Sequence, residues 1–78
     1  MNLVTIGYLE AREIPKYREM RALHSLAEKG HPGLSIERAV AAVAEFEAFL
    51  AEVRERFEVE DDALIYINAH NGRIVERV

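Results

Sequence analysis

Three residues near the middle of the chain have the types and spacing of a metal site. His24, Glu28 and His31 fall at i, i+4 and i+7, so one continuous helix would bring two imidazoles and a carboxylate to one side, a set that can bind zinc. Gly30, however, is expected to end the helix before His31, and the His-Glu-x-x-His pattern of a catalytic zinc helix is absent. We therefore interpret both histidines as surface residues and predict neither a metal nor another cofactor.

Residues for covalent catalysis are not arranged in a recognisable pattern. A nucleophile needs a base within reach, but Ser25 and Ser35 have no histidine in a known signature, and Gly7 alone makes no phosphate loop. The carboxylates lie on predicted helix surfaces, where nothing in the sequence would raise a pKa. We predict that the protein is not an enzyme; a pocket shared between subunits is our third hypothesis.

The richest polar group lies in the C-terminal part of the chain, on the predicted outer face of a β-hairpin. Aromatic, amide, imidazole and guanidinium groups there can stack bases or hold an acidic partner. The predicted partner-binding residues are Tyr66, Asn68, His70, Arg73 and Arg77. The alternative is a solvated outer face, which a sheet covered on one side needs in any case. The net charge of −4 argues against a nucleic-acid partner.

An acidic run precedes this hairpin. Its carboxylates, at positions 58, 60, 61 and 62, lack the spacing of a calcium loop. We interpret the run as a solvated connector that ends the preceding helix.

The elements predicted along the chain are a strand, two helices and two further strands. Alternating β-branched residues predict a strand over residues 2–9, and Pro15 and Gly30 delimit a helix over residues 15–29. Ser35 is the expected N-cap of a helix over residues 36–57. The remaining segment predicts a hairpin of strands 63–70 and 73–78.

The hairpin prediction depends on Asn71-Gly72, a strong two-residue turn signal. Such a turn pairs Ala69 with Ile74 and turns the polar residues away from the core. The pattern does not show whether the first strand lies beside the second or the third. The predicted fold is α+β, with two layers in the order β-α-α-β-β and an antiparallel helical hairpin packed on one face of a small three-stranded sheet.

The helix over residues 36–57 carries the most regular apolar pattern. Its large apolar residues alternate steps of three and four, the spacing of a coiled-coil a/d stripe, and a second line consists of alanines. The helix would span about 33 Å, whereas a compact chain of this length measures about 30 Å across, so one of its ends should overhang the core. The predicted self-association residues are Val43, Phe46, Phe49, Leu50, Val53 and Phe57. The alternatives are packing on the protein's own sheet and first helix, and a groove for a foreign helix.

Length and composition bound the remaining possibilities. A chain of 78 residues accommodates one domain, residues 1–78. Cysteine is absent, no signal peptide is recognisable at the start, and the longest apolar run is too short to span a bilayer. We expect a cytoplasmic protein without membrane contact. Our leading hypothesis is a small interaction or regulatory protein that binds another macromolecule and forms a homodimer through the helix over residues 36–57 or through a sheet edge. The alternative is a nucleic-acid-associated regulator using the hairpin face.

Overall fold

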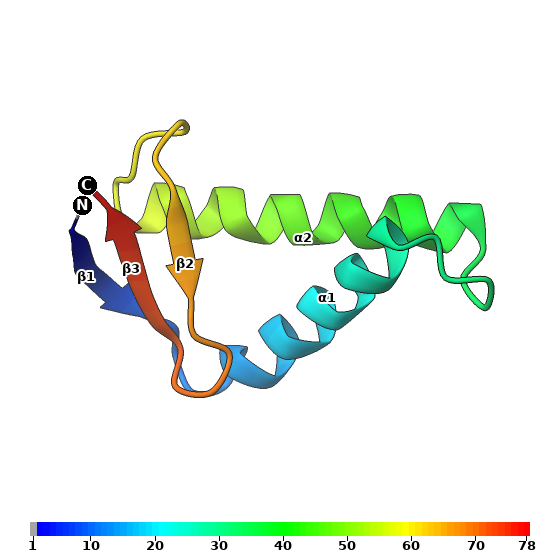
Figure 1. The fold of residues 1–78 in the computed structure, drawn as a ribbon. Helices are drawn as coiled ribbons and strands as arrows, with labels where there is room; N and C mark the ends of the chain where they lie inside the picture. Colours follow the sequence, from blue (N-terminus) through cyan, green and yellow to red (C-terminus); the bar gives the residue numbers. More distant parts are fainter. Residues whose placement is uncertain (1) are drawn as a thin grey trace.

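The computed structural model describes residues 2–78 and contains two helices and three strands (Figure 1). Along the chain these are β1 (Leu3–Tyr8), α1 (Glu13–Glu28), α2 (Ile36–Arg56), β2 (Ile65–Ile67) and β3 (Arg73–Arg77). The two helices form a hairpin against one side of a three-stranded antiparallel sheet. The predicted α+β fold and its order of elements are therefore confirmed.

The helix boundaries follow local signals in the sequence. Gly30 adopts a left-handed conformation (φ 66°) just after α1, and the Ser35 hydroxyl accepts a hydrogen bond of 3.2 Å from the N–H of Arg38 at the start of α2. Both features were predicted and are confirmed. Helix α1 begins at Glu13, two residues earlier than expected. Its N-cap residue, Arg12, makes no side-chain capping hydrogen bond, and the Glu13 carboxylate accepts a hydrogen bond from the N–H of Glu10 (3.2 Å) in the turn before the helix.

The sheet has the strand order β1-β3-β2, which answers the question that the sequence pattern left open. The C-terminal strand is central, and both β1 and β2 are edge strands. A register shift at Ile6 interrupts the pairing of β1 with β3, and beyond it Tyr8 lies opposite Arg73. This bulge reverses the alternation of side chains. Tyr8 therefore lies on the outer face and is 59% exposed, although the alternation grouped it with Val4 and Ile6.

The predicted pairing of the hairpin is wrong by two residues. Ile67, not Ala69, lies opposite Ile74, so the connection between β2 and β3 contains five residues, 68–72, instead of two. The Asn68 side chain stabilises the longer loop by accepting hydrogen bonds from the N–H groups of His70 (2.8 Å) and Asn71 (3.2 Å). Because the error is an even number of residues, the side chains within β2 and β3 stay on their predicted faces, whereas Asn68 and His70 move into the loop.

The core lies between the sheet and the parts of the two helices next to it, namely the first half of α1 and the second half of α2. Ile74 on β3 and Val53 on α2 are completely buried there. Phe57, just after α2, places its ring against Gly7 of β1, where a Cβ atom would lie 2.2 Å from the ring atom Cε1. The buried residues of this core are Leu9, Tyr17, Met20, Phe49, Val53, Ile67 and Ile74.

The far half of the helical hairpin extends beyond the sheet (Figure 1). The longest dimension of the molecule is 38 Å, and the overhanging end of α2 is its start. Ile36 is 84% exposed and Val40 is 64% exposed, whereas Phe57 at the other end is partly buried against the core. The predicted overhang is thus present, at the Ile36 end. None of the helices within residues 2–78 is long and apolar enough to cross a membrane.

An ion pair joins the start of α1 to the end of α2. Both terminal nitrogens of Arg56 donate to the Glu13 carboxylate, at 2.9 and 3.0 Å, and one of them also reaches Glu52 at 3.3 Å. Hydrogen bonding from Arg56 lowers the pKa of the Glu13 carboxyl below its ordinary value, and the same contact raises the pKa of Arg56. This pair fixes the two helices at the end where they meet the sheet.

Candidate functional site

The outer face of the sheet is not covered by any part of the chain between residues 2 and 78 (Figure 1). Its middle row places Val75 of β3 between Thr5 of β1 and Tyr66 of β2. On one side of this row, Tyr8 lies opposite Arg73. On the other side, Leu3 lies opposite Arg77, whose N–H donates to the carbonyl of Leu64 just before β2.

This face is more apolar than a solvated sheet face requires. Four large apolar side chains on it are more than half exposed: Leu3 at 61%, Tyr8 at 59%, Leu64 at 52% and Tyr66 at 51%. Single exposed apolar residues are normal on protein surfaces, but four on one face of a small sheet make that face a candidate interaction site. We call the surface formed by Leu3, Thr5, Tyr8, Leu64, Tyr66, Arg73, Val75 and Arg77 the outer face.

The charges on the outer face are all positive. Of the residues in the three strands, the only carboxylate is Glu76, which lies opposite Ile65 on the side that faces the helices. The Arg73 Nε atom donates a hydrogen bond of 2.8 Å to the Thr5 hydroxyl on the neighbouring strand. The guanidinium of Arg73 is thereby held beside the edge strand β1. A chain of net charge −4 thus presents a positive surface here.

The outer face also contains a shallow hollow. It has a volume of about 310 Å³, and its lining residues come from all three strands and the start of the hairpin loop, namely Leu3, Tyr66, Ile67, Asn68, Arg73 and Val75. A hollow that combines an aromatic ring, aliphatic side chains and a guanidinium is suited to an apolar side chain with a neighbouring anion.

The predicted partner-binding residues divide into two groups in the structure. Tyr66, Arg73 and Arg77 share the outer face, as the alternation of the strands indicated. Asn68 uses its side-chain oxygen inside the turn, and His70 belongs to the loop, where its carbonyl accepts a hydrogen bond from Arg18 of α1 at 3.3 Å. These two residues shape the loop and fasten it to α1.

Sequence reasoning placed Val75 on this face without proposing it as a binding residue, and it missed four other residues of the outer face, Leu3, Thr5, Tyr8 and Leu64. Finding Leu3 and Tyr8 required the strand order, which places β1 beside β3, and the bulge at Ile6, which turns Tyr8 outward. The available signal was the apolar character of residues 64, 66 and 75, which is unusual for an outer face.

The predicted self-association residues are also divided. Phe49 is only 7% exposed and Val53 is fully buried in the chain's own core, so neither is available to a second molecule. Phe46, Leu50 and Phe57 pack against that core and remain partly exposed. Val43 lies beside the exposed Val40 in an apolar groove of about 420 Å³ that also includes Ala27 at the end of α1.

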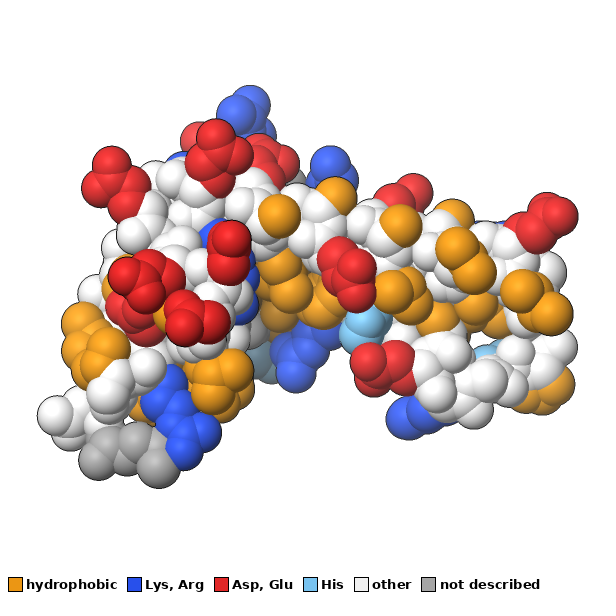
Figure 2. Space-filling view, turned by 90° about the horizontal axis from the view of Figure 1, so that it is seen from above, with side chains coloured by type: hydrophobic (Ala, Val, Ile, Leu, Met, Phe, Trp, Pro, Cys, Tyr) orange, Lys and Arg blue, Asp and Glu red, His pale blue; other side chains and the backbone are white. Residues whose placement is uncertain are grey.

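A view onto α2 shows how apolar and acidic side chains are distributed along the molecule. Figure 2 shows acidic side chains gathered at the sheet end and apolar side chains continuing along the far half of α2. The acidic connector after α2 is held through its backbone, because Arg54 donates to the carbonyls of Glu60 (2.9 Å) and Ala63 (2.6 Å). The carboxylates of the connector remain exposed.

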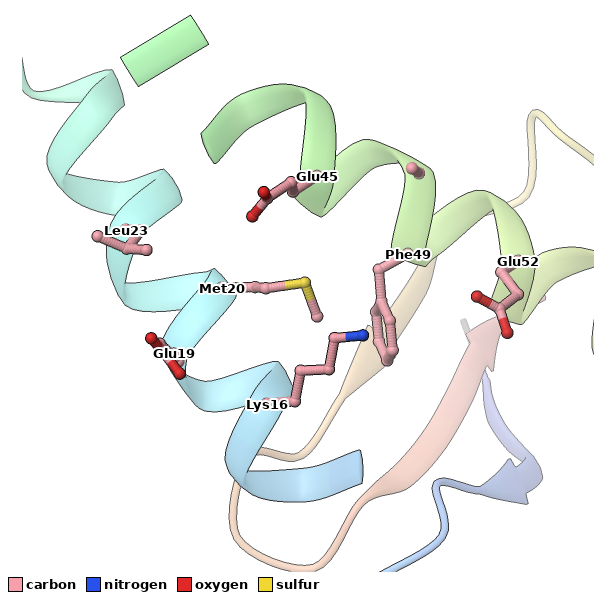
Figure 3. A pocket seen from close by; sticks show the side chains of 8 residues that line it. Lys16, Glu19, Met20, Leu23, Glu45, Phe49 and Glu52 are labelled. Carbon is pink, nitrogen blue, oxygen red and sulfur yellow. The ribbon is translucent and has the colours of Figure 1, made fainter. Parts of the chain in front are cut away.

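A second groove, of about 450 Å³, runs between the two helices (Figure 3). Met20 and Lys16 extend from α1 toward the ring of Phe49 on α2, and Glu45 and Glu52 lie along α2 on either side of that ring. The residues that line the groove include no serine, threonine or histidine. The groove therefore offers carboxylates, one amine and a small apolar floor, but no nucleophile with an adjacent base.

The three residues with metal-ligand spacing do not converge. His24 lies 3.5 Å from Glu28 and packs on the ring of Phe46 at a centroid distance of 4.5 Å. The His31 Nδ1 atom instead accepts a hydrogen bond of 3.1 Å from the N–H of Gly33. Within residues 2–78, no three His, Asp or Glu side chains gather as a metal ion would require.

Comparison with known proteins identifies no relative. No protein-family model matches the chain, and neither a curated protein sequence nor a solved structure matches it. A functional argument for this chain therefore depends on its own surfaces.

Proposed function

We propose that this protein is a small interaction or regulatory protein that binds another macromolecule through the outer face of its sheet. The observation that carries the proposal is the group of four apolar side chains, each more than half exposed, beside two arginines on an uncovered sheet. Tyrosine and arginine are enriched among the residues that dominate binding energy at protein interfaces. The partner chemistry that fits is a protein surface with apolar groups and carboxylates.

The test is capture from the native host with paired variants. In the first variant, Tyr8→Ser and Tyr66→Ser remove both aromatic rings from the outer face; in the matched control, Ile36→Ser and Val40→Ser remove two apolar residues of α2 that are more exposed than the tyrosines. We expect a protein that the wild type and the α2 variant recover and that the outer-face variant loses. Equal recovery by the wild type and the outer-face variant would refute the proposal.

A second candidate is self-association through the far half of α2. Ile36 and Val40 are 84% and 64% exposed, and with Val43 they form an apolar stripe on a part of the helix that the sheet does not cover. Light scattering at high micromolar concentration tests this candidate. The mass should be that of a dimer for the wild type and that of a monomer for the Ile36→Ser, Val40→Ser variant. A monomeric wild type would eliminate self-association.

A nucleic-acid partner is the alternative use of the same outer face. Two tyrosines and two arginines on a sheet can stack bases and contact phosphates. Binding to phosphates is strongest at low salt, so a gel shift with single-stranded and duplex DNA at about 50 mM salt decides the question. We expect no shift, because the net charge of −4 opposes binding.

A further inference from the structure

The edge strand β1 has backbone groups that no neighbouring strand uses. Asn2 and Val78 exchange two hydrogen bonds, of 3.0 and 2.9 Å. Because hydrogen-bonded and non-hydrogen-bonded pairs alternate in an antiparallel ladder, the N–H and C=O groups of Leu3 and Thr5 point away from β3. The outer edge of β1 is therefore open at these two residues.

The open edge lacks the charged and proline residues that usually protect such strands. Residues 3–8 have the sequence LVTIGY, which contains neither a charge nor a proline. The side chains of Leu3, Val4 and Tyr8 are exposed, at 61%, 46% and 59%. The bulge at Ile6 ends the regular segment, so the open edge comprises Leu3 to Thr5. The other edge strand, β2, has only three residues.

A cation lies beside this open edge. The hydrogen bond from Arg73 Nε to the Thr5 hydroxyl, at 2.8 Å, brings the guanidinium from the central strand to the edge strand. Among the described residues, the Thr5 hydroxyl is the only side-chain partner of Arg73, and no carboxylate contacts the Arg73 guanidinium. The remaining guanidinium N–H groups can receive a carboxylate in a two-pronged contact.

We propose that an extended, acidic segment of a protein partner adds to β1 as a fourth strand. Its backbone exchanges hydrogen bonds with Leu3 and Thr5, and one of its Asp or Glu side chains binds Arg73. Main-chain hydrogen bonds give affinity and alternate side chains give specificity in this mode of recognition. The inference rests on the proposed function and names the chemistry of its partner.

Two requirements, a carboxylate for Arg73 and a peptide backbone for β1, distinguish this occupant from the two others that the edge could accept. A second copy of β1 would bring no carboxylate to Arg73, because residues 2–9 contain none. A nucleic acid could bring a phosphate to Arg73, but it has no peptide backbone to match the spacing of the open N–H and C=O groups. An acidic peptide satisfies both the open backbone groups and the guanidinium.

The test is an NMR titration of the full chain with synthetic peptides. The probe is a twelve-residue peptide of alternating valine and glutamate, and the matched reference has glutamine at every glutamate position. We expect the glutamate peptide to shift the amide signals of Leu3 and Thr5 and to bind about tenfold more tightly than the glutamine peptide, the ratio that one charge-assisted hydrogen bond provides. Equal binding of the two peptides, or no shift at these amides, would overturn the proposal.

A proline substitution isolates the backbone contact. Thr5→Pro removes an N–H that points away from β3 and has no hydrogen-bond partner within residues 2–78, whereas Thr5→Val also loses the hydroxyl but keeps the N–H. The valine variant should bind the glutamate peptide, and the proline variant should lose at least tenfold in affinity. If Thr5→Pro does not fold, Leu3→Pro, with Leu3→Val as its control, makes the same comparison.

Each contrary outcome identifies a different occupant. If Thr5→Val is a dimer in solution and Thr5→Pro is a monomer, a second copy of the chain uses the edge. If oligothymidylate binds more tightly than the glutamate peptide, the surface binds nucleic acid. If Thr5→Pro still recovers the native partner that the outer-face variant loses, strand addition is wrong and the proposed function stands. If the wild type recovers no partner that depends on the outer face, the proposed function itself fails.

Discussion

The contact between Gly7 and the Phe57 ring couples the edge strand β1 to the end of α2. A Cβ atom added at Gly7 would lie 2.2 Å from Cε1 of Phe57 and 2.8 Å from Cδ1 and Cζ. Non-bonded carbon atoms ordinarily lie at least about 3.5 Å apart, so the ring would have to move roughly 1.3 Å away from the sheet. We expect Gly7→Ala to lower the free energy of unfolding by about 1–3 kcal/mol, the usual cost of overfilling a packed site.

Urea unfolding monitored by circular dichroism measures this change. With a slope of about 1 kcal/mol per molar urea, typical of a small domain, the midpoint should fall by about 1–3 M. A matched control is Gly33→Ala, where the nearest atom is 3.1 Å away in the exposed ring of His31. A shift of this ring by a few tenths of an ångström relieves the contact, so the free energy of unfolding should stay within about 0.5 kcal/mol of the wild type.

A double-mutant cycle tests the cause of the effect. If the ring of Phe57 is the obstacle, Phe57→Leu should reduce the cost of Gly7→Ala by about 1 kcal/mol or more, because the two residues are in contact. A Gly7→Ala variant as stable as the wild type would refute the reasoning. An unchanged cost in the Phe57→Leu background would refute it too.

Two further substitutions test the buried core and the ion pair between Glu13 of α1 and Arg56 of α2. Ile74→Ala removes a fully buried side chain from the central strand and should cost about 2–5 kcal/mol in urea unfolding, whereas Val75→Ala, half-buried on the opposite face, should cost less than half as much. Glu13→Gln should cost about 1 kcal/mol at pH 7, where its ion pair with Arg56 is intact. The pKa of Glu13 is below its ordinary value of 4.5, so the advantage of the wild type is constant above that pH and declines as the pH falls through the lowered folded-state pKa. If the wild type keeps its full stability advantage over Glu13→Gln down to pH 2, the ion pair with Arg56 is not the source of that advantage.

The helices were the most predictable part of the fold. Gly30 and Ser35 act through their own backbone and side chain, so their effects on the helix ends are local and visible in the sequence. The length of α2 also predicted an overhang, which the exposed Ile36 confirms. The outward position of Tyr66, Arg73 and Arg77 followed from alternation alone, because a register error of two residues does not move a side chain to the other face.

The remaining features depend on contacts between distant residues. The strand order and the bulge at Ile6 are set by the packing of β1 on β3, and no local signal marks either. The turn signal of Asn71-Gly72 was overridden by the side chain of Asn68, which stabilises a longer loop. Sequence periodicity grouped Val53 with the exposed stripe of α2, yet the sheet buries it completely.

The most direct measurement of the central proposal is the dissociation constant of the purified native partner for two single variants. Tyr66→Ala removes an exposed ring from the middle row of the outer face, and Val40→Ala removes a comparably exposed side chain from α2. Tyr66→Ala should raise the dissociation constant about tenfold or more, as an interface hot spot does, while Val40→Ala should leave it within about twofold. The reverse pattern would place the binding surface on α2 and contradict the account.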